Sequence, residues 1–519
     1  MVRHGMLSRG CENCRKRKIK CDQARPDCSQ CLKGGWKCPQ YGDTLERIFQ
    51  RRGPSDFGEG QNLAPLMPMG RSSSSFPKQS RLSSTNYICG SSFVTKTTTV
   101  SSEHHDLSFC APLERGIIHP INSRAIEFFL ASQIFHQPDI IRGYYEYLPA
   151  LTRYATVDKR LFNSLSAVAL AAYAYNFRHA TILKKARWYY GQALQCVNNA
   201  LSSINESVQD STIISILLLS TFENMTCDDR KSFRNTEAHM IGVMAILNMR
   251  GRSQFEPRHR LQIFQHMCTC LHLSSLIHSI RIPRQLRILR AHAAEFLDTD
   301  DPAWKLSGIM AKLAKFREDV KTKVIRNRSD IVQSALEIDQ DLTLLEDQMP
   351  YQWHFQTVSL PTKCHLVFDT YYHIYPDLWV ACTWNNLRTC RLLLHKEICK
   401  QLLKVSHTGF VAEGSVYQNS KMILQQIIDE ICATIPQFCD NLSSLADSKA
   451  HLAKYRNTIP ANAAGYFLMW PLLNMSSIID SEIQREWVVH WTCYIGRKSG
   501  IQQAFVVADL LRTKQEFTI

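Results

Sequence analysis

Six cysteines near the N-terminus have a spacing that suits metal ions better than disulfides. They are Cys11, Cys14, Cys21, Cys28, Cys31 and Cys38. The intervals between them hold two, six, six, two and six residues, so one unit is written twice with an offset of 17. Thiolates are preferred ligands of structural zinc, and closely spaced cysteine pairs are typical of zinc sites. The chain starts without a secretory signal, which favours reduced thiols over disulfides.

The number of thiols predicts how many zinc ions they bind. A structural zinc ion takes four tetrahedral ligands, so one ion would leave two of the thiols unused. Two ions need eight ligand positions, which six sulfurs can fill only if two of them bridge both metals. The near-twofold repeat suggests that equivalent cysteines of the two halves bridge, and Cys11 with Cys28 is one such pair. Since so small a segment has almost no hydrophobic core, we expect its fold to depend on metal.

A dense basic run lies between the second and third of these cysteines. Its charged members are Arg15, Lys16, Arg17, Lys18 and Lys20, and the second half of the repeat adds Lys33 and Lys37. A short helix here would turn the run outward, where Lys and Arg neutralise phosphates and can reach base edges, above all the acceptors of guanine. We therefore predict that these seven residues bind double-stranded DNA. The weaker alternative is a solvated face that serves only as a nuclear-import signal.

The sequence from Cys11 to Cys38 resembles the fungal zinc binuclear cluster (Zn2Cys6) transcription factors. The resemblance rests on the six cysteines, on the basic run between Cys14 and Cys21, and on Pro26 in the position of the family's interhelix loop. It implies two zinc ions bridged by Cys11 and Cys28, a base-reading role for Lys18, and recognition of CGG triplets. It also implies a nuclear regulator of RNA polymerase II genes, not an enzyme.

Charge and composition divide the chain into three parts. Residues 1–52 carry 13 Lys or Arg and five Asp or Glu, so about half of the net charge of +15 lies in a tenth of the chain. We assign residues 1–42 to the cysteine-rich DNA-binding domain. Residues 43–112 form a short charged segment followed by a Ser/Thr-rich stretch that we expect to be disordered. Residues 113–519 are expected to form one large regulatory domain.

The pattern of this third part is helical. Apolar residues recur at three- and four-residue steps, for example at Ala186, Tyr190, Ala193 and Val197, and strand-like alternation is scarce. We therefore expect an all-α domain of a dozen or more helices. The stretch from His239 to Gly251 resembles the signature of the fungal-specific transcription factor domain, with its histidine, its glycine and a Leu-x-x-Arg-Gly ending.

Partners other than DNA are less well defined by the sequence. Leu45, Ile48 and Phe49 give barely two helical turns before Gly53 and Pro54, so no coiled coil is sustained and a homodimer would need the helical domain. Transcription co-regulators are further candidates. The uncharged stretch at residues 161–177 is short and polar, and no membrane partner is expected.

Two other clusters of polar residues have simpler explanations. His266 and Cys270 share one helix face and Cys268 and His272 another, so each face offers two ligands where a closed zinc site needs four. We favour core packing for this cluster. The acidic residues among leucines between Asp339 and Asp347 could form an activation patch, but we favour a plain amphipathic helix.

Two competing functions follow from these features. In one, the cluster is a zinc-dependent module that binds protein or phosphate, and the helical domain is the working part. In the other, the helical domain houses an enzyme. No HExxH, phosphate-loop or GxSxG motif supports catalysis. The sequence therefore predicts a transcription regulator first.

Overall fold

The structure is a computed structural model that describes scattered residues between 11 and 38 and six longer ranges. These ranges are 120–133, 144–155, 158–227, 235–403, 411–439 and 461–516. The segment 43–112, which we expected to be a linker, lies outside the described residues. The cysteine-rich segment and the helical region are therefore each described by themselves.

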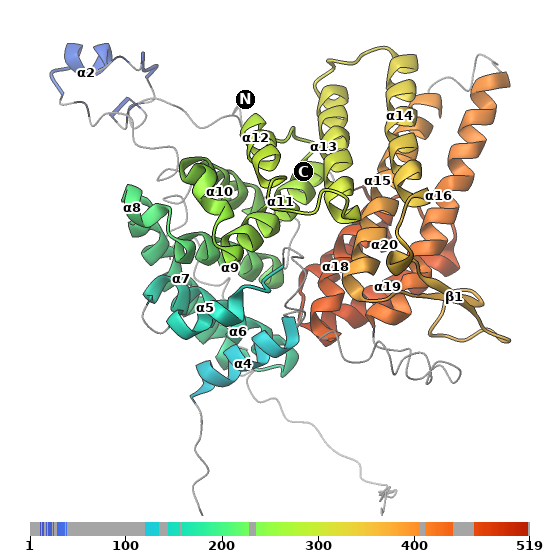
Figure 1. Ribbon diagram of the computed structural model, residues 1–519, viewed down its shortest axis with the longest axis horizontal. Coiled ribbons are helices and arrows are strands. Elements are labelled where there is room, and N and C mark those ends of the chain that lie inside the picture. Colours follow the sequence, from blue (N-terminus) through green and yellow to red (C-terminus); the bar gives the residue numbers. More distant parts are fainter. Residues whose placement is uncertain are drawn as a thin grey trace, which may run out of the picture. The chain divides into compact units, whose positions relative to one another are not determined.

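The helical region is built almost entirely of α-helices (Figure 1). Its first part contains α4 (Ile121–Gln133), α5 (Leu148–Ala155), α6 (Lys159–Asn176), α7 (Ala180–Leu201), α8 (Ile204–Ser207), α9 (Asp210–Thr226), α10 (Asn235–Arg250), α11 (Arg258–His278) and α12 (Arg284–Ala293). Its second part contains α13 (Pro302–Lys321), α14 (Arg328–Asp347), α15 (Leu378–Leu403), α16 (Val411–Phe438), α18 (Ala461–Met475), α19 (Glu482–Ser499) and α20 (Gln503–Thr513). The expected all-α class is confirmed.

Several helices begin where the sequence supplies a capping side chain. Asp158 accepts a hydrogen bond from the amide of Arg160 at the start of α6. Asp301 caps α13 through the amide of Trp304 and is followed by Pro302, a residue that suits the first helical position. Ser481 caps α19 through the amide of Gln484. These caps satisfy amide groups that have no acceptor within the helix.

The core of the first part is organised around α6. Its residues from Ser164 to Ala172 are all buried, because α4, α7 and α9 pack around it. Helix α9 is buried to a similar degree, from Thr212 to Ser220. Helices that are apolar on every side are typical of the centre of a large domain. The long uncharged stretch at 161–177 is thus a core helix.

The second part contains a row of long helices in which α13 packs on α14, α14 on α15, and α15 on α16 (Figure 1). Helices α18, α19 and α20 complete it, and α19 also contacts α6 of the first part. Gly500 ends α19 with φ of 69°, and a Cβ there would lie 2.7 Å from the Cβ of Tyr175. A glycine is therefore required where the end of α19 approaches α6.

A short hairpin interrupts the helices. Strand β1 (Gln356–Ser359) pairs antiparallel with β2 (Tyr371–Ile374), with Gln356 opposite Ile374. Each strand has four residues, which is too short for a clear alternating pattern, so the sequence did not predict them. The hairpin packs on α16.

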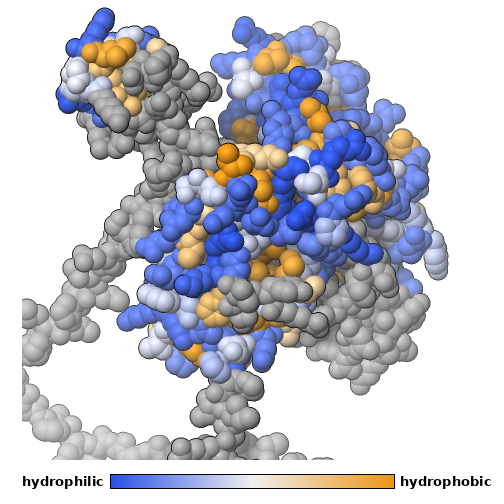
Figure 2. All heavy atoms as spheres, turned by 60° about the vertical axis from the view of Figure 1, so that its left-hand side comes forward, coloured by the Kyte–Doolittle hydropathy of each residue, from blue (hydrophilic) through white to orange (hydrophobic). Residues whose placement is uncertain are grey.

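On the face drawn in Figure 2, hydrophilic residues cover most of the helical region, and hydrophobic ones form scattered patches. Large exposed apolar side chains, such as those of Trp188, Ile204 and Ile483, belong to different helices. Among the described residues, no helix has the length and apolar character needed to cross a bilayer.

Candidate metal centre

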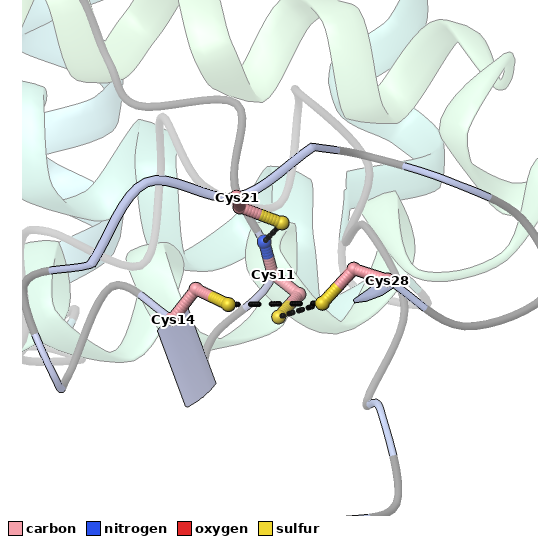
Figure 3. A group of neighbouring side chains, drawn as sticks. All are labelled: Cys11, Cys14, Cys21 and Cys28. Carbon is pink, nitrogen blue, oxygen red and sulfur yellow. Dashed lines mark hydrogen bonds between the residues drawn. The ribbon is translucent and has the colours of Figure 1, made fainter. Parts of the chain in front are cut away.

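The six cysteines form two groups of four sulfurs that share two members. The first group is Cys11, Cys14, Cys21 and Cys28, and the second is Cys11, Cys28, Cys31 and Cys38. Within each group all sulfurs lie within 4.8 Å of one another. Figure 3 shows the first group, in which the thiols of Cys11, Cys14 and Cys28 point toward one another. The shared pair is the one that two bridged zinc ions would require.

The distances between the sulfurs fit tetrahedral zinc. With Zn–S bonds of about 2.3 Å, two thiolates on one ion lie roughly 3.8 Å apart. The Sγ atoms of Cys11 and Cys28 are 3.7 Å apart, those of Cys11 and Cys31 3.6 Å, and those of Cys14 and Cys28 3.7 Å. All these sulfurs are buried, so little water competes with them for a bound metal ion. The six-cysteine group is positioned to bind zinc.

The repeat seen in the sequence is also present in the backbone. The amide of Arg17 donates to the carbonyl of Asn13 at 3.1 Å, and 17 residues later the amide of Gly34 donates to that of Gln30 at 3.1 Å. In the same way, Ile19 donates to Cys14 at 3.0 Å and Trp36 to Cys31 at 2.9 Å. Each half is thus one helical turn that closes with the same pair of bonds. Because the two halves have the same backbone structure, the shared sulfurs come from the same position in each half, Cys11 and Cys28.

The second helical turn is capped by its own cysteine. Helix α2 (Ser29–Lys33) begins after Cys28, whose sulfur accepts the amide of Cys31 at 3.4 Å. The carboxylate of Asp22 also accepts the amide of Ser29, at 3.1 Å, and the Ser29 hydroxyl lowers the pKa of this carboxyl. The cap thus binds the loop before α2 to the helix and holds the bridging sulfur in place.

Burial controls the ionisation of the thiols when no metal charge offsets it. Burial raises the pKa of Cys14 and of Cys28, and it raises that of Cys31 to about 12. For Cys11 burial acts in the same direction, but hydrogen bonds from Cys14 outweigh it and lower the pKa to about 6. Zinc binding must therefore release protons from most of these sulfurs, which makes the affinity for zinc dependent on pH.

Three of the seven predicted DNA-binding residues are described. Arg17, Lys20 and Lys33 are all exposed, as a role at the phosphate backbone requires. The other four, Arg15, Lys16, Lys18 and Lys37, lie outside the described residues.

Trp36 contacts a basic side chain of the cluster, a role that its sequence position did not predict. The guanidinium carbon of Arg17 lies 3.5 Å from the centroid of the Trp36 ring, the geometry of a cation–π contact. The ring lies against Gly34, where a Cβ would come within 2.7 Å of two ring atoms. Trp36 thus joins a basic side chain of the first half to the turn of the second. A Gly-Gly-Trp sequence beside a cysteine cluster was the available signal.

The cluster from His266 to His272 packs in the core of the helical region. His266 is buried, and its Nδ1 atom lies 2.9 Å from the hydroxyl of Tyr147. His272 is also buried, with Nδ1 at 2.6 Å from the carbonyl of Cys268. Within the described part of the chain, the two cysteine groups are the only sets of side chains that could hold a metal ion. Core packing explains these histidines.

Part of the acidic stretch 339–347 is used inside the fold. Asp339 is buried and bonds the Nε atom of Arg391 at 2.9 Å and the Nε2 atom of His395 at 3.1 Å. Glu346 contacts the same arginine at 3.1 Å. These carboxylates belong to the packing of α14 on α15, as expected for an amphipathic helix.

The geometry defines a class of protein: a two-zinc, six-cysteine cluster joined in one chain to a large helical domain. Comparison with known proteins agrees. Residues 9–47 match the fungal Zn(2)-Cys(6) binuclear cluster domain, and residues 138–362 match the fungal specific transcription factor domain. The chain belongs to the family that joins these two domains, and zinc is its cofactor.

Individual relatives resemble this chain only around the cluster. The oleate activated transcription factor 3 of Kluyveromyces lactis is 56% identical over 41 residues, which cover 8% of this chain and 6% of the relative. A protein of Schizosaccharomyces pombe, described as a transcriptional regulatory protein, is 42% identical over 57 residues, or 11% of this chain and 6% of that protein. The matches thus span a small fraction of each relative. No solved structure matches the chain.

Proposed function

We propose that this chain is a sequence-specific DNA-binding regulator of RNA polymerase II genes that reads CGG-like triplets. The observation that carries the proposal is the pair of four-sulfur groups sharing Cys11 and Cys28, surrounded by exposed basic side chains. Two zinc ions in these groups would neutralise most of the thiolate charge. The surrounding Lys and Arg side chains would then be free to face the phosphates of DNA.

Each residue of the cluster has a distinct role in this proposal. The six cysteines hold the two zinc ions. Lys18, assisted by Arg17, reads base edges in the major groove, where guanine presents two acceptors. The remaining basic residues contact phosphates and fix the orientation of the cluster on the duplex. They are Arg15, Lys16, Lys20, Lys33 and Lys37.

The rest of the chain would serve regulation. We assign residues 1–42 to the DNA-binding domain, 43–112 to a linker, and 113–519 to a regulatory domain that binds co-regulators or restrains the cluster. A regulator of this family acts in the nucleus. Its oligomeric state would be set by the helical domain, since no sustained heptads follow the cluster.

The test is a selection from a random duplex pool with the zinc-loaded full-length chain. Salt of about 150 mM suppresses non-specific binding. Enrichment of a CGG-like core is expected, with a second triplet at fixed spacing for a dimer and a lone triplet for a monomer. No enrichment from a protein that holds its zinc would overturn the proposal and favour a zinc-dependent interaction module.

A pair of variants separates base reading from phosphate contact. Lys18→Ala should lose discrimination between the selected site and a scrambled duplex, by roughly 1–3 kcal/mol if the contact is bidentate. Lys33→Ala should weaken binding to both duplexes alike. It should also reduce the slope of log affinity against log salt concentration by about one, as expected for the loss of one phosphate contact. Full base preference in Lys18→Ala would show that another residue reads the bases.

A further inference from the structure

The helical region contains a cavity of about 150 Å³ between its two parts. Side chains from α9, α11, α15 and α18, together with Tyr144, Tyr145 and Gln503, form its wall. Protein interiors hold few voids larger than a water molecule, and an empty cavity costs stability in proportion to its volume. A void of this size is about what a benzene-sized guest fills.

The wall carries no formal charge. Among the described residues that line the cavity, none is Lys, Arg, Asp or Glu. Burial holds several ionisable groups of the wall neutral, because it raises the pKa of Tyr466 and raises those of Cys270 and Cys382 to about 12. Burial likewise lowers the pKa of His266 to about 3. A charged ligand would therefore lose its hydration without gaining a counter-ion.

Part of the wall is aromatic. The rings of Tyr144 and Phe467 meet edge to face with centroids 4.9 Å apart, and Tyr466 lies beside them. Trp379 and Trp470 add two indoles to the lining. Aromatic faces and edges favour the stacking of a further ring.

Several polar groups of the wall are bonded to each other, but the indole N–H of Trp470 is not. The hydroxyl of Tyr145 lies 2.6 Å from that of Thr221, and the amide of Asn224 donates to the hydroxyl of Tyr466 at 3.0 Å. The indole N–H of Trp470 is buried and has no hydrogen-bond acceptor among the described residues. A buried donor without a partner is costly, so a ligand whose acceptor reaches this N–H would relieve that cost.

We propose that this cavity is a binding site for an uncharged aromatic molecule of about one ring that accepts a hydrogen bond from Trp470. Because its wall joins α9 and α11 to α15 and α18, an occupant stabilises the packing of the two parts against each other. The site is independent of the zinc cluster, so the proposal does not rest on how the cluster reads DNA.

The probes for this site are benzene, pyridine and benzoate, titrated into the zinc-loaded full-length chain at pH 7.5 and followed by ligand-observed NMR. Benzene and pyridine have the same ring, but only pyridine accepts a hydrogen bond, and benzoate carries a charge. We expect saturable binding of benzene and pyridine and at least roughly tenfold weaker binding of benzoate.

Two variants locate the binding. Leu273→Trp fills the cavity and should abolish binding of both uncharged rings. Trp470→Phe keeps the aromatic wall but removes the donor, so it should weaken pyridine by roughly three- to tenfold and leave benzene unchanged within about twofold. Circular dichroism would verify that both variants keep their helices.

The proposal is overturned if neither uncharged ring binds saturably to the unaltered chain, or if folded Leu273→Trp binds them as before. Equal binding of benzoate would refute the uncharged class of ligand. Equal loss of benzene and pyridine in Trp470→Phe would refute the role of the indole donor. None of these readouts depends on DNA binding, so a failure here is distinct from a failure of the proposed function.

Discussion

The guanidinium carbon of Arg17 lies 3.5 Å from the centre of the Trp36 ring, so a basic side chain of the first cysteine repeat is held by an aromatic side chain of the second. Arg17 is exposed and Trp36 is half-buried. The stack restricts a long side chain that would otherwise sample many rotamers. It thus orients the guanidinium before DNA arrives.

Replacing the aromatic partner should weaken binding to DNA. An exposed cation–π contact contributes about 0.5–1 kcal/mol, so Trp36→Leu should raise the Kd for the selected duplex by roughly two- to fivefold. The zinc content should stay unchanged, because Trp36 is not a ligand. Fluorescence anisotropy with a labelled duplex measures the effect. Trp36→Phe, which keeps an aromatic face, is the control. Its Kd should lie between those of the unaltered chain and Trp36→Leu. A Kd unchanged in Trp36→Leu would mean that Arg17 is not oriented by the ring.

The bridging and terminal cysteines should differ when they are replaced. Cys28 belongs to both four-sulfur groups, whereas Cys38 belongs to one. The unaltered chain should hold about two zinc ions. Cys38→Ser should retain the zinc ion of the first group. Cys28→Ser should have a lower zinc content, because this substitution removes a ligand from both groups. Zinc content after dialysis, measured by atomic emission, checks this order.

The control for this experiment is Cys196→Ser, a partly exposed thiol on α7 that lies in neither group. It should keep the full zinc content. Equal zinc loss from Cys28→Ser and Cys38→Ser would contradict the assignment of Cys28 as a bridge. Removing zinc with a chelator should abolish DNA binding while the helical signal in circular dichroism persists, since the helices are held by their own core.

Zinc binding could be predicted from the sequence because it depends on ligand count and spacing along the chain. The two-group arrangement around Cys11 and Cys28 agrees with that count. The contact between Arg17 and Trp36 could not be predicted, since it joins two repeats whose arrangement depends on the metal core. The positions of Lys18 and three other basic residues are not described, so their roles remain predictions.

Helices with long periodic patterns were likewise predictable, since their apolar spacing shows which face is buried. The stretch predicted from Ala186, Tyr190, Ala193 and Val197 corresponds to α7, in which these four residues are buried. The hairpin β1–β2 was not predicted, because strands of four residues carry too little alternation. The cavity was not predictable either, because its wall combines side chains from segments more than 300 residues apart, such as Tyr145 and Trp470.

A buried ion pair near the end of α10 should stabilise the first part of the helical region. The side chain of Arg250 is buried, and it donates to Asp210 at 2.5 Å and to the carbonyl of Val208 at 2.6 Å. Replacing it with methionine roughly keeps the packing volume but leaves Asp210 with only the partly exposed His259 and Arg260 as partners. We expect Arg250→Met to lower the free energy of unfolding by about 2–4 kcal/mol, measured by urea denaturation.

The neighbouring pair of Arg252 and Glu295 provides the matched control. It has the same length of 2.5 Å, but both side chains are more than half exposed. Solvent screens such a pair, so Arg252→Met should change the free energy of unfolding by less than about 1 kcal/mol. If the two variants were equally stable, burial would not be what makes Arg250 important.

Stability should fall in mild acid because buried histidines resist protonation. The pKa values of His266, His272 and His373 are lowered to about 3, mainly by burial and, for the last two, also by Arg290 and Arg388. In the unfolded chain a histidine takes up a proton near pH 6.5, so acid favours unfolding below that pH and the full stability is present only above it. Each buried histidine should cost about 1 kcal/mol between pH 6.5 and 5.5.

Replacing one of these histidines should flatten that dependence. His272→Leu removes a group whose Nε2 atom has no partner among the described residues, so the slope of unfolding free energy between pH 7 and 5 should decrease. The carboxyls of Asp210 and Asp339, whose pKa values are lowered by their Arg and His partners despite burial, stay ionised in this window and do not contribute to the slope. The exposed His490, replaced in the same way, is the control and should leave the slope unchanged. Urea denaturation at each pH measures all three chains. An identical slope in His272→Leu and the unaltered chain would show that folding does not lower the pKa of His272.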